Sequence, residues 1–223
     1  MLNAAKVLFC DSILAELQMA IFATSERLTF NDIQRKHGNI FELVEAAELY
    51  IRNNMKWKVD FDGSRERKET PEIPIQALRE ALINSFCHKD YNAQQCNEVA
   101  IYKDRIEIYN PGKFPDGYTP EDFILRDERP VRRNPLITQI LYYSKDVESF
   151  GSGLKRITNA CEEANVKVDY KLMKSGFIVV FQREIDNTQK AQVEAQVEAQ
   201  VEILIMRACQ KTPLSSGEIV IAL

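Results

Sequence analysis

The 223-residue sequence predicts an α+β sandwich, because segments with helical periodicity and segments with strand periodicity alternate irregularly along it. Its composition supports a folded chain: 45% of the residues are hydrophobic and 9% are aromatic, which is too apolar for global disorder. Eight glycines and eight prolines are too few for a collagen-like or low-complexity protein. The length allows one large domain, or a smaller domain with appendages.

The first 70 residues contain one helical pattern among strand-like segments. Apolar residues recur at helical spacing from residue 41 to residue 55. Three apolar or alternating runs predict strands, at residues 7–11, 18–24 and 57–61. The charged stretch 63–69 is typical of a solvated loop or a hairpin tip, and Pro71 and Pro74 follow it, so we expect a domain boundary there.

Residues 75–182 carry the most regular pattern. They predict helices at 75–86, 136–143 and 153–165, and strands at 99–103, 105–109 and 176–182. Pro74 suits the first turn of the first helix, because no backbone N–H is needed at that position. The first two strands form a hairpin, and residues 110–134 form a long loop that we interpret as a functional lid.

Beyond Glu184 the sequence changes to a repeat. Ala-Gln-Val-Glu occurs three times between residues 191 and 202, and the helix propensity of these residues predicts a helix. This helix is either a plain connector or a self-association element. Residues 213–223 predict the start of an amphipathic helix that the sequence does not complete. We therefore expect the chain to be a piece of a longer protein.

Charge, cysteine spacing and hydropathy exclude several classes of protein. Lys and Arg number 29 against 33 Asp and Glu, so the net charge of −4 gives no overall basic field for nucleic acid. The five cysteines form no C-x-x-C pair, which favours reduced thiols over a zinc site or a disulfide framework. No apolar run approaches the roughly 18–20 residues of a membrane span, so we expect a cytoplasmic protein with no membrane partner.

Three polar residues share one stripe of the helix expected at 75–86. Glu80, Asn84 and His88 follow one another at a spacing of four residues. The opposite stripe is apolar and consists of Leu78, Leu82 and Phe86. Because most of the remaining circumference is also apolar, we expect the carboxylate and the amide to line a pocket; the alternative is an exposed polar stripe. We interpret His88 as a packing or hydrogen-bonding residue rather than a base.

Two turns and one charged segment carry further candidate residues. The Gly151-Ser152-Gly153 turn opens a helix, where free N–H groups attract phosphate; the alternative is an ordinary loop before a helix. The Asn110-Pro111-Gly112 turn follows a strand and by itself indicates only a turn. Three arginines of the expected lid either reach an anion or belong to a solvated loop, at positions 129, 132 and 133.

The order of these motifs resembles the GHKL (Bergerat) ATPase fold of gyrase B, MutL and sensor histidine kinases. More closely, residues 80–91, 104–112, 133–135 and 151–154 are similar to the C-terminal module of bacterial RecG-related helicases and transcriptional regulators. In that family a Schlafen-type AlbA domain usually precedes the module, and a winged helix often follows it. The resemblance implies a two-layer α/β sandwich of Bergerat type with a mixed sheet and a helical C-terminal extension.

The resemblance also divides the chain into four segments. These are the tail of an AlbA-type domain with connecting helix and strands at 1–70, a GHKL ATPase-like domain at 71–184, a helical connector containing the repeat at 185–206, and the start of a truncated winged-helix domain at 207–223.

On the phosphate side, the resemblance assigns a role to each candidate. Asn84 would hold Mg²⁺, and Glu80 would orient or deprotonate the attacking water. Three residues of the glycine turn would present N–H groups to phosphate, assisted by a neighbouring cation: Gly151, Ser152 and Gly153, with Lys155 or Arg156.

On the base side, the sequence departs from the family pattern. Asn110 and Gly112 stand where the family carries Asp-x-Gly-x-Gly, whose aspartate recognises the adenine amino group. Asn110 replaces the acid and Phe114 replaces the second glycine. The amide still offers a carbonyl acceptor, but its bond to adenine is neutral and weaker than a charge-assisted one.

Three hypotheses follow for the function. The first is a transcriptional regulator with an ATP-binding module, a candidate Mg-dependent ATPase that acts as a homodimer and reaches DNA through domains largely outside this chain. The second is a non-catalytic scaffold or dimerisation module that couples an AlbA domain to a winged-helix DNA-binding domain. The third is direct nucleic-acid binding through the arginines at 126–133, against which the net charge argues. A helicase motor is disfavoured, since the sequence lacks a Gly-x-x-x-x-Gly-Lys-Ser/Thr phosphate loop.

Overall fold

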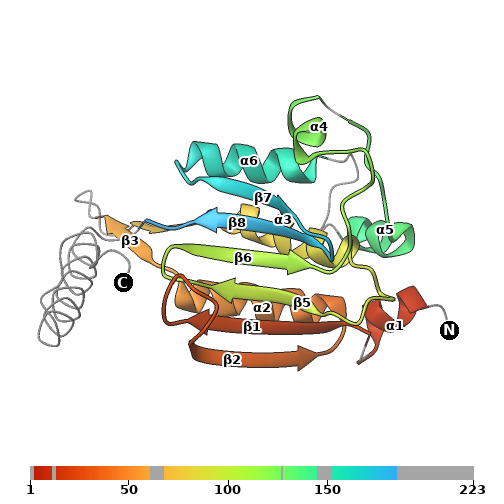
Figure 1. The fold of residues 1–223 in the computed structure, drawn as a ribbon, viewed down its shortest axis with the longest axis horizontal. Coiled ribbons are helices and arrows are strands. Elements are labelled where there is room, and N and C mark those ends of the chain that lie inside the picture. The colour runs from red at the N-terminus through yellow and green to blue at the C-terminus, as the bar shows by residue number, and fades with distance from the viewer. Residues whose placement is uncertain (1–2, 12–13, 61–67, 127, 145–151, 185–223) are drawn as a thin grey trace, which may run out of the picture. The chain divides into compact units, whose positions relative to one another are not determined.

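The computed structural model describes residues 3–11, 14–60, 68–126, 128–144 and 152–184 (Figure 1). Contacts divide the chain into Met1–Arg183 and Glu184–Leu223, and the fold described below belongs to the first part. The repeat at 191–202, the expected helical extension and the expected winged-helix start at 207–223 all lie outside the described residues.

The described residues form six helices and eight strands. The helices are α1 (Asn3–Phe9), α2 (Ile40–Asn54), α3 (Ile75–Cys87), α4 (Pro120–Leu125), α5 (Pro135–Tyr143) and α6 (Gly153–Glu163). The strands are β1 (Glu16–Phe22), β2 (Phe30–His37), β3 (Trp57–Asp60), β4 (Lys68–Pro71), β5 (Asn97–Ile101), β6 (Arg105–Asn110), β7 (Val168–Leu172) and β8 (Phe177–Gln182).

The main sheet has six strands in the order β2-β1-β5-β6-β8-β7 (Figure 1). Strands β1 and β5 run parallel, with Leu17 opposite Asn97, and the other neighbouring pairs of this sheet are antiparallel. The sheet is therefore mixed, as expected. Strands β3 and β4 form a separate antiparallel pair.

One face of the main sheet is covered by helices. In Figure 1, α2 and α3 lie behind the strands, and α3 also packs against α6 and β6. Residues alternate along β6 so that Ile106 and Ile108 are buried while Arg105 and Glu107 are only partly covered. This alternation is what a strand with one face in the core requires. The fold is the predicted α+β, two-layer α/β sandwich.

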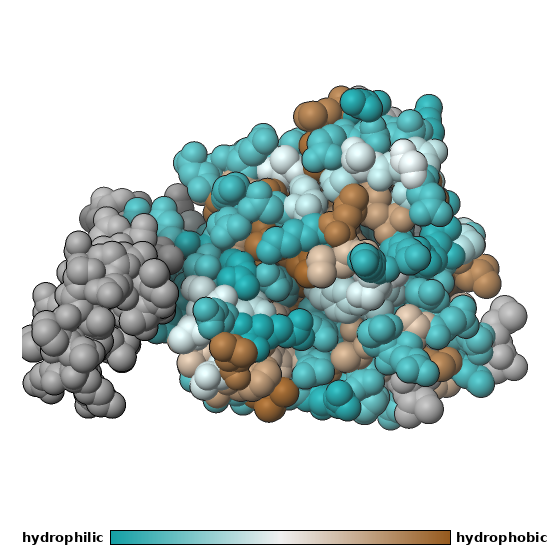
Figure 2. Space-filling view, viewed as in Figure 1, coloured by the Kyte–Doolittle hydropathy of each residue, from teal (hydrophilic) through white to brown (hydrophobic). Residues whose placement is uncertain are grey.

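The other face of the sheet is turned toward the viewer, where hydrophilic residues predominate (Figure 2). A small apolar cluster lies among them and consists of Ala20, Phe22, Ala100 and Tyr102. The Arg105 guanidinium carbon lies 3.8 Å from the centroid of the Tyr102 ring and covers this cluster. The main core and the candidate site thus both lie on the helical side.

Most of the expected helices and strands are confirmed, but the strand expected at 7–11 is wrong. Residues Asn3–Phe9 form the helix α1, in which the adjacent residues Val7 and Leu8 are buried. An apolar run this short fits either kind of element, and packing decided for the helix. The sequence also does not predict α4, β2, β4 or β7. Strand β2 escapes detection because nearly all its residues are exposed, so no hydrophobic alternation marks it.

The main sheet contains strands from both sides of residue 70, since β1 precedes that position and β5 follows it. One hydrophobic core accordingly extends from Val7 to Phe181. The assignment of residues 1–70 to the tail of an AlbA-type domain stays a prediction. Among the helices within the described ranges, none has the length and apolar character that crossing a membrane requires.

Candidate functional site

The polar stripe of α3 faces a cavity of about 320 Å³, which Glu80, Asn84 and His88 all line. The apolar stripe of the same helix explains this orientation, because Leu78 and Leu82 are buried in the core. Turning that stripe inward leaves the other stripe toward the cavity. The expected pocket is therefore present, and the alternative of an exposed polar stripe is wrong.

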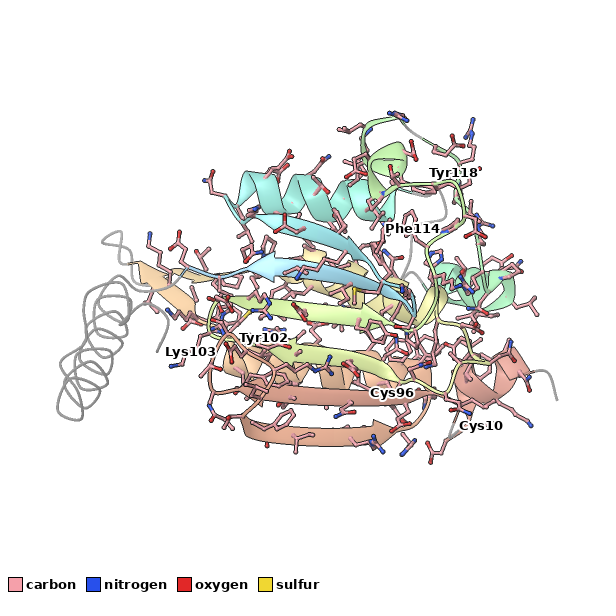
Figure 3. All side chains as sticks on the ribbon, viewed as in Figure 1. Cys10, Cys96, Tyr102, Lys103, Phe114 and Tyr118 are labelled. Carbon is pink, nitrogen blue, oxygen red and sulfur yellow. The ribbon has the colours of Figure 1, made fainter. Side chains whose placement is uncertain are left out.

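The cavity walls are mainly apolar and come from strands β6 and β8, helices α3, α4 and α6, and the connections between them. The apolar side chains are Ile108, Phe114, Phe123, Val131, Leu154, Ile157, Phe177 and Val179. The Phe114 ring lies 5.7 Å from Phe123 and 5.1 Å from Phe177, measured between ring centroids. Figure 3 shows Phe114 on the chain segment that leads from β6 to α4. An apolar cavity with few polar groups is the usual form of a small-molecule site.

A hydrogen-bonded network joins α3 to α6 at the polar end of the cavity. The Arg156 Nη2 group donates to Glu80 Oε2 at 2.6 Å, and the Asn84 Nδ2 group donates to Glu80 Oε1 at 3.0 Å. Both carboxylate oxygens of Glu80 therefore have a protein partner. The bond to Glu80 orients the Asn84 amide. Its Oδ1 oxygen can therefore accept a hydrogen bond from a ligand or coordinate a metal ion.

The start of α6 packs directly onto this network. A Cβ atom built at Gly153 would lie 2.6 Å from Asn84 Nδ2 and 2.7 Å from Glu80 Oε1, closer than van der Waals contact permits. Only glycine therefore allows the first turn of α6 to approach the network. Ser152 is the N-cap residue, and its side chain makes no capping hydrogen bond. The backbone N–H groups of this turn are thus not satisfied by their own cap.

Not every expected phosphate-side residue reaches the cavity. Gly153 and Leu154 line it, but Ser152 and Lys155 do not, and Gly151 lies outside the described residues. Lys155 follows two lining positions on α6, and each residue of a helix is rotated by about 100° from the last, which turns it away. The next residue, Arg156, does contact a cavity residue, because its side chain reaches Glu80.

At the opposite end, the turn after β6 brings Asn110 into the cavity. Asn110 is only 3% exposed, and its side chain makes no hydrogen bond with any residue in the described part of the chain. A Cβ atom at Gly112 would lie 2.5 Å from the backbone oxygen of His88, so this turn packs tightly on the end of α3. The Asp90 N–H donates to the Pro111 carbonyl at 2.6 Å and fixes the same contact.

Two titratable groups at the C-terminal end of α3, His88 and Cys87, are held neutral. Burial, assisted by the charge of Arg133, lowers the pKa of His88 to about 4, so its imidazole carries no charge at pH 7. Burial raises the pKa of the Cys87 thiol to about 12, which keeps it protonated. Neither group is prepared to act as an acid, a base or a nucleophile at neutral pH. The role of His88 in packing or hydrogen bonding stays a prediction.

The expected lid contributes cations to the rim. Arg132 and Arg133 line the cavity with Lys113, whereas Arg129 does not. Arg133 Nη2 donates to the Lys113 carbonyl at 2.6 Å and joins the two sides of the rim.

The asparagine of the 133–135 motif has a structural role that sequence reasoning did not find. Asn134 Nδ2 donates to the carbonyl oxygens of Cys87 at 2.9 Å and Lys89 at 2.8 Å. It therefore fixes the end of α3 next to His88, and with it the position of the cavity rim. Carbonyl groups at a helix end need such partners, but only the tertiary structure identifies which residue supplies them.

The donor set fits a magnesium ion better than a transition metal. No group of three His, Cys, Asp or Glu side chains that could hold a metal occurs in the described ranges. The Asn84 Oδ1 oxygen is the kind of ligand that Mg²⁺ accepts together with waters and phosphate oxygens. A metal held in that way needs few protein ligands, so the residues present are compatible with it.

Comparisons with known proteins agree with this fold. Residues 96–181 match the family model described as "Putative ATP-dependent DNA helicase recG C-terminal". Among solved structures, the DIP2311 protein from Corynebacterium diphtheriae is similar with a TM-score of 0.69 at 21% sequence identity. That match covers 81% of this chain and 37% of the other, so the present chain spans well under half the length of its neighbour. A search of curated proteins found no match.

The two comparisons differ in what they establish. At 21% identity the solved structure shows the fold alone. The family match includes Asn110, Gly112 and Gly153, although it begins after the α3 residues Glu80 and Asn84. It confirms the resemblance noted in the sequence. Residues 96–181 of this chain are therefore similar to the ATPase-like C-terminal module of RecG-related proteins.

Proposed function

We propose that the cavity binds Mg-ATP. One observation carries the proposal: three motifs that are distant in sequence, on α3, after β6 and at the start of α6, contribute to the same cavity through Asn84, Asn110 and Gly153. The ATPase-like family match of residues 96–181 supports a nucleotide as the ligand. An apolar cavity with polar groups at two ends suits a molecule with a flat apolar base and a charged tail.

The phosphates would lie at the polar end, beside the first turn of α6. The N-terminus of a helix carries a partial positive charge and free N–H groups, which stabilise phosphate. Gly153 lets the ligand approach this backbone, and Arg156 adds a full positive charge. Asn84 would contribute Oδ1 to Mg²⁺, and the bound ion would neutralise phosphate charge next to the Glu80 carboxylate.

Hydrolysis, the second part of the proposal, would be slow. Glu80 is the candidate group that orients or deprotonates water. Both of its oxygens accept hydrogen bonds, from Arg156 and Asn84, so a water molecule reaches the carboxylate only after one bond opens. Phosphate binding gives Arg156 a competing partner, which favours that opening.

Calorimetric titration with MgATP tests the binding site. We expect the wild type to bind and Asn84→Ala to bind at least about tenfold more weakly, since it removes the magnesium ligand. Asn159→Ala is the matched control, because Asn159 is an exposed asparagine of α6 and should leave affinity unchanged. Equal affinity in Asn84→Ala, or no binding by the wild type, would contradict the proposal.

Phosphate release tests hydrolysis separately. We expect release by the wild type to disappear in Glu80→Gln, which keeps the shape of the side chain but removes the charge. Glu163→Gln is the control, since Glu163 is an exposed carboxylate near the end of α6. If the wild type binds MgATP but releases no phosphate, the proposed nucleotide site stands and the proposed ATPase activity is contradicted.

A non-catalytic scaffold is the second candidate function. The observation that favours it is the closed Glu80-Arg156-Asn84 network, which satisfies the polar end of the cavity without any ligand. In this case α3 and α6 would be held together as a rigid platform for dimerisation, or for coupling an AlbA domain to a winged helix. Phosphate release that disappears in Glu80→Gln would exclude this alternative.

We further propose the setting in which the module works: a cytoplasmic transcriptional regulator that forms a homodimer and contacts DNA through domains largely outside this chain. A filter-binding titration of the present chain with duplex DNA should show no salt-sensitive retention, because its net charge is −4. Strong, salt-sensitive retention would instead favour direct DNA binding through the arginines at 126–133.

A further inference from the structure

The two asparagines of the cavity differ in how their amides are held. The Asn84 amide donates to Glu80 Oε1 at 3.0 Å, which fixes its orientation. The Asn110 amide has no hydrogen-bonding partner among the described residues, although Asn110 is only 3% exposed. Because this residue lines the cavity, its amide is available for a ligand there.

The surroundings of Asn110 are apolar or already paired. Ile108 lies on the same side of β6, and Phe177 is the cross-strand partner of Asn110 on β8. Ser85 also lines the cavity, but its hydroxyl donates to the Leu82 carbonyl at 2.6 Å and accepts from the Asn97 amide at 3.0 Å. The Asn110 amide is thus the group at this end that can recognise the edge of a flat apolar ligand.

We propose that Asn110 determines the base specificity of the site and makes it accept both adenine and guanine nucleotides. This inference rests on the proposed nucleotide binding. An amide has one acceptor and one donor side. Toward adenine, Oδ1 accepts from the exocyclic amino group while Nδ2 donates to the adjacent ring nitrogen.

Guanine presents the reverse pattern on the same edge, with an oxygen acceptor beside a ring N–H donor. Rotation of the Asn110 amide by 180° exchanges its donor and acceptor and satisfies this pattern equally well. No hydrogen bond within the described residues holds the amide in either orientation, so the rotation breaks nothing. An ionised aspartate at this position accepts only, so it can form only one of the two hydrogen bonds with either base: it repels the ring nitrogen of adenine and the oxygen of guanine.

The test is a calorimetric titration of the full chain with MgATP and with MgGTP. For the wild type we expect dissociation constants within about fivefold of each other. For Asn110→Asp we expect both MgATP and MgGTP binding to weaken by at least about tenfold, because a carboxylate can form only one of the two hydrogen bonds with each base. Asn159→Asp adds the same charge at an exposed position of α6 and should keep both wild-type affinities.

The outcomes separate this inference from the proposal beneath it. If the wild type binds neither nucleotide, the proposed nucleotide site is wrong. If it binds MgATP and prefers it over MgGTP by about a hundredfold or more, the nucleotide site stands and the inference on Asn110 is overturned. Unchanged affinity for both nucleotides in a folded Asn110→Asp variant overturns it as well. The ratio of the MgATP and MgGTP dissociation constants of the wild type is measured without any variant, so the inference can still be tested if Asn110→Asp fails to fold.

Discussion

The two ends of the cavity satisfy their polar groups in opposite ways. At the end next to α6, Glu80 is paired with Arg156 and Asn84, and both carboxylate oxygens have partners. At the end next to β6, Asn110 is buried among apolar side chains and its amide has no partner in the described part of the chain. One end is complete without a ligand, whereas the other gains its hydrogen bonds only from one.

This difference separates binding from chemistry. A ligand gains free energy at the Asn110 end without breaking any protein contact. At the Glu80 end it must first replace existing hydrogen bonds, which costs free energy and leaves Glu80 engaged. We therefore expect base recognition to be strong and hydrolysis to be slow, and four substitutions or conditions test the contrast.

The largest effect is expected at the contact between α6 and the network. Gly153→Val places side-chain atoms where even a Cβ atom would lie 2.6 Å from Asn84 Nδ2. We expect MgATP affinity to fall by about a hundredfold, because the Asn84 and Glu80 side chains are displaced from the first turn of α6. Asn159→Val, at an exposed position of the same helix, is the control. Calorimetry that finds similar affinity in both variants would place the phosphates elsewhere.

Acid should act through His88, at the Asn110 end of α3. Burial lowers the pKa of this imidazole from 6.5 to about 4. Between these pH values the unfolded chain therefore binds a proton at His88 that the folded chain does not bind. The contribution of neutral His88 to the free energy of unfolding is fully present above pH 6.5 and is lost as the pH falls to about 4. The loss is about 3 kcal/mol at most.

Urea unfolding at pH 7 and pH 5 measures this effect. His88→Gln should flatten the pH dependence between these values, while substitution of the exposed His37 by Gln should not change it. An equal pH dependence in the wild type and in His88→Gln would show that other groups carry it.

Breaking the ion pair at the polar end should cost less. Arg156→Met leaves the Glu80 carboxylate, which is 12% exposed, without its cation, and we expect a loss of about 2 kcal/mol in the free energy of unfolding. Adding Glu80→Gln to this variant should recover about 1 kcal/mol, since the unpaired charge is then removed. Arg129→Met, at an exposed position, is the control. Strict additivity of the two losses would contradict the coupling.

The smallest effect is expected at the end of α3. Asn134→Ala removes two hydrogen bonds to the carbonyls of Cys87 and Lys89, and we expect a loss of about 1 kcal/mol. Asn54→Ala, which removes a single bond to the Tyr50 carbonyl at the end of α2, should cost less. Denaturant midpoints of the two variants give the comparison, and the reverse order would mean that Asn134 does not fix the cavity rim.

Sequence patterns predicted the elements that have one buried and one polar face. Helix α3 was predictable because its apolar and polar stripes are distinct, and β6 because its buried residues alternate. The exposed edge strand β2 and the short helix α1 lack such a pattern. The structure of β2 depends on its pairing with β1, and that of α1 on its packing in the core.

The sequence likewise predicted which residues are candidates for the site, but not which residues they contact. The spacing of Glu80 and Asn84 placed them on one face of α3, and the Gly153 and Gly112 turns were visible as turns. That Arg156 pairs with Glu80 depends on how α6 packs against α3, as does the need for glycine at 153.

By itself, then, the sequence determined the α+β class, the polar stripe of α3 and the order of three motifs, because these depend on local periodicity and spacing. Only the tertiary structure decided that the motifs meet at one cavity, that Glu80 is paired and that Asn110 is not. The physical reason is that a buried polar group is satisfied by whatever the packing brings near it, and packing joins residues that no local pattern connects.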